Sequence, residues 1–197
     1  FGETLGVDIT GFLRPHILYL LRHLYENNWP SVDLLYAEPV RYSRGSLTAF
    51  SGDVSLVRQV RGYEGAHTTD TDDEYLVVGC SYDAKLMSAV ANSRLRARKV
   101  QMFPFPALRP HMYQENRVRT QECQNSFGAV GDVLHAPGHD PFATAHVLSN
   151  YVIERSSRIK NLYLSPLATK PQVVGFALYY LMECIGQAVS ITFPFSS

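Results

Sequence analysis

Apolar and polar positions follow two alternating patterns along most of the chain. Short continuous apolar runs are typical of strands buried on both faces, and stretches with apolar residues three and four positions apart are typical of helices. The runs predict strands at residues 5–10, 31–37, 75–80, 99–106, 161–164 and 188–193. The stretches between them predict helices at residues 13–27, 82–93, 110–119, 142–155 and 171–185. This alternation predicts an α/β fold, a Rossmann-like and mostly parallel doubly wound sheet.

Residues 38–74 interrupt the regular pattern. Glycines and prolines recur there, and residues 68–74 are mostly threonine and acidic residues, which predicts a solvated loop. Residues 55–60 alternate as an edge strand does. We therefore expect an irregular or hairpin-bearing insertion around residues 38–74, and a second loop at residues 128–141.

The composition is that of an ordinary globular domain. Of the 197 residues, 46% are hydrophobic and 18% are charged, so residues 1–197 can bury the core of a single Rossmann-like domain. Eighteen basic and 18 acidic residues cancel. The chain therefore lacks the net positive charge that a non-specific nucleic-acid binder normally carries. Because the chain begins with Phe1 and a strand follows almost at once, we expect a fragment of a longer multidomain protein.

The cysteines and the apolar runs bear on the cellular compartment. Cys80, Cys123 and Cys184 are odd in number and widely spaced, which favours neither a disulfide framework nor a zinc site. Cys80 follows an apolar strand, where a buried thiol is commoner than a nucleophile. Uninterrupted apolar runs stay well short of the ~20 residues needed to cross a bilayer. These features predict a cytoplasmic protein without a membrane partner and without a bound metal.

The candidate binding residues lie where predicted strands turn into helices. Ligands of doubly wound sheets bind outside the carboxyl ends of the strands. Ser165, Thr169 and Lys170 follow one buried strand, and a helix begins directly after them. Thr10 and Arg14 occupy similar positions after the first strand. Free backbone N–H groups at such helix starts bind anions, so we expect Thr10, Arg14, Ser165, Thr169 and Lys170 to bind a ligand in one crevice.

The chemistry of these positions indicates an anionic ligand. Hydroxyls, backbone donors and two cations suit a nucleotide-like or other phosphorylated small molecule, because arginine grips phosphate bidentately and lysine supplies a point charge. A lysine at the positive end of a helix, such as Lys170, is unfavourable without an anion. The glycine patterns of dinucleotide-binding oxidoreductases and P-loop nucleotidases do not occur in the chain. The identity of the ligand, and of any cofactor, stays open.

Two other groups of residues could support catalysis. His135, His139 and Asp140 could bind a metal or transfer protons, but their segment is also good turn chemistry, and Asp140 could cap the next helix. Asp8 could act as a base with Glu38 as its partner, or it could cap the turn after its strand. The turn and cap interpretations leave no catalytic residue assigned, and we expect no turnover from this fragment.

The segment Ser165-Pro-Leu-Ala-Thr-Lys-Pro171 between a strand and an apolar helix resembles the elbow of CRISPR-associated Rossmann-fold (CARF) sensor domains and their SAVED relatives. This resemblance implies a module of a bacterial antiviral defence protein that senses an oligonucleotide messenger and controls a linked effector domain or partner subunit. By the resemblance, Thr169 and Lys170 would contact the ligand. Those families often carry paired glycines where this chain has Leu167 and Ala168.

Three functional interpretations follow from the sequence. The first is a ligand-sensing or regulatory module that binds a nucleotide or another phosphorylated small molecule. The second is a nucleotide or nucleoside hydrolase, which requires Asp8, Glu38 or the His135 and His139 pair to line the same crevice as Lys170. The third is a scaffold domain without a ligand, whose crevice side chains would fill. Association of copies of the chain into a homo-oligomer is compatible with all three.

Overall fold

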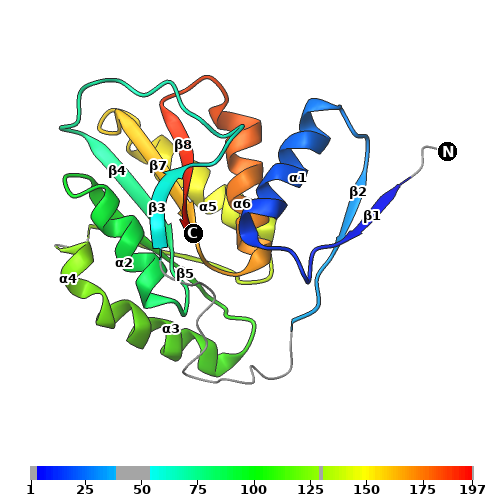
Figure 1. The fold of residues 1–197 in the computed structure, drawn as a ribbon, viewed down its shortest axis with the longest axis horizontal. Coiled ribbons are helices and arrows are strands. Elements are labelled where there is room, and N and C mark those ends of the chain that lie inside the picture. Colours follow the sequence, from blue (N-terminus) through cyan, green and yellow to red (C-terminus); the bar gives the residue numbers. More distant parts are fainter. Residues whose placement is uncertain (1–3, 39–53, 129–130, 197) are drawn as a thin grey trace.

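The computed structural model describes residues 4–38, 54–128 and 131–196, and its centre is a six-stranded sheet (Figure 1). The strand order is β3-β8-β7-β4-β5-β6, in which β4 to β8 run parallel and β3 runs antiparallel to β8. The strands are β3 (Val54–Gln59), β4 (Glu74–Gly79), β5 (Arg98–Pro104), β6 (Val133–Ala136), β7 (Asn161–Pro166) and β8 (Val189–Ser196). The prediction of an α/β, Rossmann-like and mostly parallel sheet is confirmed.

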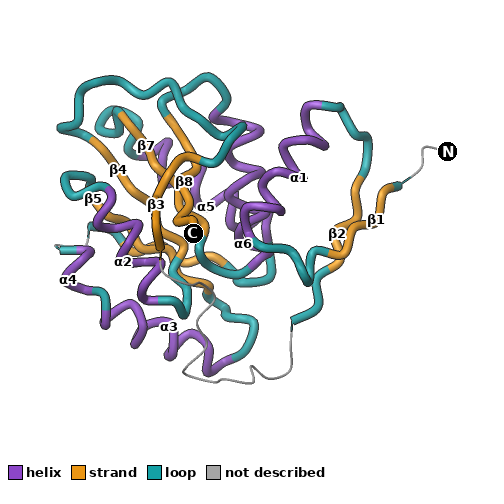
Figure 2. Tube along the Cα trace, viewed as in Figure 1, coloured by secondary structure: helices purple, strands orange, loops and turns teal. Residues whose placement is uncertain are grey.

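Helices cover both faces of this sheet (Figures 1 and 2). One face carries α2 (Ala84–Ser93), α3 (Pro110–Glu122) and α4 (Gln124–Phe127), and the other carries α5 (Pro141–Glu154) and α6 (Lys170–Tyr179), which a π-helical turn, η2 (Tyr180–Cys184), extends. From β4 the chain proceeds outward through β5 to β6, and then returns through α5 to β7, which pairs with the other side of β4. The strand order therefore reverses between β4 and β7, which is where Rossmann-like sheets bind ligands.

The amino-terminal strands differ from the prediction, which placed them in the main sheet. Strands β1 (Leu5–Asp8) and β2 (Val32–Leu35) form a separate parallel pair, and α1 (Arg14–Glu26) connects them (Figure 2). Helix α1 packs against α6, which also contacts α5 and β7. Because it is covered on several sides, α6 is apolar around most of its circumference.

The predicted insertion is described only in part, since residues 39–53 lie outside the described ranges. The alternating residues form β3 at the edge of the sheet, as predicted, paired with β8. The predicted loop at residues 128–141 is partly wrong, because residues 133–136 form β6. This strand has four residues, includes His135 and ends before Pro137 and Gly138, so its sequence lacks the continuous apolar run of a central strand. Within the described ranges, every helix is too short or too polar to span a membrane.

Candidate functional site

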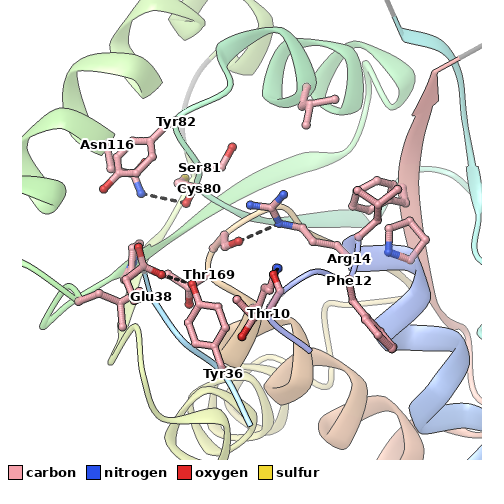
Figure 3. Close-up of a pocket in the computed structure, with 18 of the residues that line it drawn as sticks. Thr10, Phe12, Arg14, Tyr36, Glu38, Cys80, Ser81, Tyr82, Asn116 and Thr169 are labelled. Atoms are coloured by element: carbon pink, nitrogen blue, oxygen red, sulfur yellow. Dashed lines mark hydrogen bonds between the residues drawn. The ribbon is translucent and has the colours of Figure 1, made fainter. Parts of the chain in front are cut away.

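A pocket of about 780 Å³ opens where the strand order reverses (Figure 3). It is lined by the segments that follow β1, β2, β4, β5 and β7, by helix α3 and by the end of β8. Apolar and aromatic side chains make up most of the wall, among them Phe12, Tyr36, Leu86, Met112 and Phe193. Such a pocket with a few polar groups is typical of a small-molecule site.

The two predicted elbows, which are the strand-to-helix turns at residues 10–14 and 165–170, meet at one side of this pocket. The guanidinium Nε of Arg14, in the first turn of α1, donates to the carbonyl of Ala168 at 2.9 Å. The ammonium of Lys170, in the first turn of α6, donates to the carbonyls of Ile9, at 3.2 Å, and Thr10. The cationic side chain of each elbow thus donates a hydrogen bond to the backbone of the other elbow. Four of the five predicted binding residues, Thr10, Arg14, Thr169 and Lys170, line the pocket.

The hydroxyls of Thr10 and Thr169 hold the backbone around the pocket. Thr10 Oγ1 accepts a hydrogen bond from the amide of Ala37 at 2.8 Å. Thr169 Oγ1 donates to the carbonyl of Gly138 at 2.6 Å and accepts from the amide of Gln172 at 3.4 Å, so Thr169 caps α6. Both threonines thus fix loops that border the pocket.

Ser165, the fifth predicted residue, lies elsewhere. It is fully buried in β7, paired in register with Val78 of β4, and does not line the pocket. The strand continues to Pro166, two residues beyond its predicted end, so Ser165 belongs to the strand and not to the turn after it. Its hydroxyl has no hydrogen-bond partner among the residues that the structure describes.

The cation of Lys170 has protein partners, so its place at a helix start does not by itself require an anion. The carbonyls of Ile9 and Thr10 accept hydrogen bonds from the ammonium that the sequence suggested for a phosphate. Burial, and then the neighbouring charge of Arg14, lower the pKa of Lys170, while Glu38 and Asp8 oppose that shift. Lys170 is thus a half-buried cation beside a second cation, and both conditions disfavour its charged form.

We expect Lys170→Met to lower the free energy of unfolding by about 1.5–3 kcal/mol, because hydrogen bonds to charged groups contribute that much and two carbonyls would lose their donor. Urea denaturation followed by circular dichroism measures the difference. Lys160→Met is the matched control, since Lys160 makes exposed ion pairs with Asp70 and Asp73 and should matter less. Equal losses in the two variants would contradict the structural role of Lys170.

The histidine-rich segment lies outside the pocket lining. His135, on β6, is exposed, and its Nε2 lies 3.3 Å from the hydroxyl of Tyr113. Partial burial, with a smaller contribution from Arg117, lowers the pKa of His135. His139 is exposed in a turn, and Asp140 caps α5 by accepting from the amide of Ala143 at 2.9 Å. Within the described ranges, no group of three or more histidine, cysteine, aspartate or glutamate side chains could hold a metal ion. This geometry favours the turn and cap interpretation.

The other candidate catalytic groups have structural partners. Asp8 Oδ1 accepts from the amide of Thr10 at 2.8 Å, and hydrogen bonds from Thr10 lower the pKa of Asp8, which fits the cap interpretation. Glu38 lines the pocket and accepts a hydrogen bond from the hydroxyl of Tyr36. The thiol of Cys80 is fully buried, and burial raises its pKa to about 12, so it is protonated at neutral pH.

Sequence reasoning missed the polar group that α3 contributes. Asn116 lines the pocket, and its Nδ2 donates to the carbonyl of Cys80 at 2.9 Å. The chain after β4 continues through Ser81 and Tyr82, which also line the pocket, to Asp83, which caps α2. An aspartate shortly after a buried strand is a helix-start signal that could have directed attention to this loop.

Four helices begin at the pocket, and their starts differ. Asp83 caps α2 and Thr169 caps α6 through their side chains, whereas α1 and α3 begin without a side-chain cap. Leu13, Arg14 and Pro15 all line the pocket. The start of α1 therefore brings the positive end of a helix dipole and a guanidinium to the same wall.

Comparison of the chain with protein-family models, with curated proteins and with solved structures found no match. The resemblance of the elbow at Thr169 and Lys170 to CRISPR-associated sensor domains stays a prediction from sequence. What bears on function is the position, lining and charge of the pocket.

Proposed function

We propose that this chain is a regulatory module that binds a nucleotide or another phosphorylated small molecule in the pocket beyond the carboxyl ends of β4 and β7. The observation that carries the proposal is the position of the pocket. It opens beyond the carboxyl ends of parallel strands, where the strand order reverses and where ligands of this class of sheet bind. The resemblance to CRISPR-associated sensor domains implies that ligand binding would act on a linked effector domain or partner subunit of a bacterial defence protein.

The shape and lining of the pocket suit a ligand with a flat, weakly polar ring. A volume of about 780 Å³ falls within the ~300–1,000 Å³ typical of small-molecule sites. Phe12, Tyr36 and Phe193 supply aromatic surface, and Leu86 and Met112 supply aliphatic surface. The body of the ligand would gain its binding energy mainly from burial against these walls.

The side of the pocket formed by the two elbows suits the anionic group. Arg14 and Lys170 contribute two positive charges there, against one negative charge from Glu38. Helix α1 begins at this side without a side-chain cap, so its dipole favours an anion at the same place. Figure 3 shows the guanidinium of Arg14 extending from α1 toward the loop that carries Cys80 and Ser81.

We propose binding without turnover. Glu38 is the one described carboxylate in the pocket lining, and it is hydrogen-bonded to Tyr36. His135 and His139, which a hydrolase of the kind considered above would use, lie outside the lining. Of the groups that the hydrolase interpretation could use, Glu38 therefore lines the pocket with Lys170, but the described lining places no histidine beside it.

Isothermal titration against a panel of nucleoside monophosphates and inorganic phosphate tests the proposal. We expect at least one nucleotide to bind, and Arg14→Gln to weaken its binding about 10- to 100-fold, because hydrogen bonds to charged groups contribute ~1.5–3 kcal/mol. Arg22→Gln is the matched control, since Arg22 lies on the same helix, pairs with Glu26 and is not part of the pocket lining.

The outcomes separate the three interpretations. Binding that Arg14→Gln weakens and Arg22→Gln leaves unchanged supports the sensing module. Equal binding by both variants would contradict an anion site at the start of α1. Failure of every nucleotide to bind would favour the scaffold interpretation, and release of phosphate or free base during the titration would favour the hydrolase.

A further inference from the structure

Asn116 lines the pocket, and the oxygen of its side-chain amide is a buried acceptor without a hydrogen-bond partner among the described residues. Asn116 is 2% exposed on α3, and its Nδ2 donates to the carbonyl of Cys80 at 2.9 Å. That carbonyl needs a donor, which fixes the orientation of the amide and leaves Oδ1 as the free end. Oδ1 is buried and has no hydrogen-bond partner among the residues that the structure describes.

An unpaired acceptor at this position needs an explanation. Leaving a buried polar atom without a partner costs about 1–3 kcal/mol, and nearly all such atoms in folded proteins are paired. An apolar side chain at residue 116 would avoid this cost, although the carbonyl of Cys80 would then lose its donor. Asn116 lines the pocket, so a ligand that displaces the atoms now covering Oδ1 can supply the missing donor.

The position of Asn116 relative to Arg14 defines what such a ligand carries. In the view of Figure 3, Cys80 and Ser81 lie between Asn116 and the guanidinium of Arg14. The two residues thus belong to different parts of the wall, one supplying an acceptor and the other a cation. A ligand that uses both carries an anionic group toward Arg14 and an N–H donor toward Asn116.

We infer that Asn116 is a specificity-determining residue that accepts a hydrogen bond from the exocyclic amino group of a nucleobase. The inference rests on the proposed function, since it assigns the part of the nucleotide that the pocket reads. Amide Oδ1 accepts from an amino group and not from an oxo group or a ring carbon, so the site favours an amino-bearing base over the analogue in which hydrogen replaces that group. A site built to pair with a donor rejects an analogue without it, because its own buried polar group is then left unpaired.

Titration of the wild-type chain with pairs of ligands tests this inference. Adenosine monophosphate and cytidine monophosphate are each compared with the analogue in which hydrogen replaces the exocyclic amino group. We expect the amino-bearing member of one pair to bind at least about tenfold more tightly, which corresponds to ~1.4 kcal/mol. Asn116→Leu should remove this difference, and circular dichroism would show whether that variant is folded.

The titrations distinguish a failure of the inference about Asn116 from a failure of the proposed nucleotide site. If both members of each pair bind equally to the wild type, the role of Asn116 is overturned while the pocket remains a nucleotide site. If neither nucleotide nor analogue binds, the nucleotide site and the inference about Asn116 are both overturned. A discrimination that persists in a folded Asn116→Leu variant would assign the amino group to another residue and overturn the inference.

Discussion

Replacing Gly175 with valine is expected to lower the free energy of unfolding by about 3 kcal/mol, the upper end of the usual cost of overpacking a core. Gly175 lies in α6 where this helix packs against α5. A Cβ atom at residue 175 would lie 2.5 Å from the carbonyl oxygen of Pro141 and 2.6 Å from Cβ of Thr144. Both distances are far below van der Waals contact, and one of the opposing atoms belongs to the backbone, so the two helices would have to separate.

The stability lost through overpacking should exceed the stability gained when a residue with a higher helix propensity replaces glycine. Removing a glycine from a helix interior stabilises the helix by up to ~1 kcal/mol when nothing obstructs the new side chain. Gly175→Ala should therefore lower stability less than Gly175→Val. Chemical denaturation measures both, and a shift of the midpoint with an unchanged slope would show that stability changed without a change in the surface exposed on unfolding.

Gly6→Val is the matched control. A Cβ atom at residue 6, in β1, would meet nothing within 4 Å, and valine suits a strand. We expect little change in its midpoint. If Gly175→Val unfolded at the wild-type denaturant concentration, the close approach of α5 and α6 would be contradicted.

The strand, elbow and helix around residues 161–181 could be predicted because local signals agree there. A buried apolar run ends, Thr169 offers a cap, Pro171 suits a helix start and an apolar helix follows. The same agreement placed Thr10 and Arg14 at a second helix start. Local agreement of this kind also predicted the α/β class and the edge strand β3.

Other features depend on which segments meet in space. The pairing of β1 with β2 outside the main sheet accompanies the packing of α1 on α6, and the short strands at residues 5–8 and 32–35 carry no sign of it. The partners of Lys170 are main-chain carbonyls of a distant elbow, which a sequence pattern cannot indicate. Asn116 is buried only because α3 packs beside the loop after β4, and the polar sequence of α3 lacks an apolar stripe that would mark its inner face.

The second large effect is expected at the opposite end of the parallel strands. Asn161 is the fully buried first residue of β7, and its amide binds the loop that precedes β4. Oδ1 accepts from the amide of Thr68 at 2.9 Å, and Nδ2 donates to the carbonyls of Thr68 at 3.1 Å and Asp70 at 2.8 Å. One side chain thus satisfies three backbone groups of the loop.

Asn161→Ala should lower the free energy of unfolding by about 2–4 kcal/mol, because three hydrogen bonds to the loop are lost and each contributes ~0.5–1.5 kcal/mol. Thermal or urea denaturation measures the loss. Asn150→Ala is the matched control, since Asn150 is exposed on α5 and its amide contacts the ring of His146. Surface substitutions of this kind usually change stability by less than ~0.5 kcal/mol.

The same variant also separates stability from binding. Asn161 begins β7, whereas the pocket lies beyond the carboxyl end of that strand. At a temperature where Asn161→Ala remains folded, we therefore expect it to bind a nucleotide as tightly as the wild type does, in contrast to Arg14→Gln. A loss of affinity equal to that of Arg14→Gln would mean that the loop held by Asn161 and the pocket respond as one unit, and that ligand binding is coupled to order at the far end of the sheet.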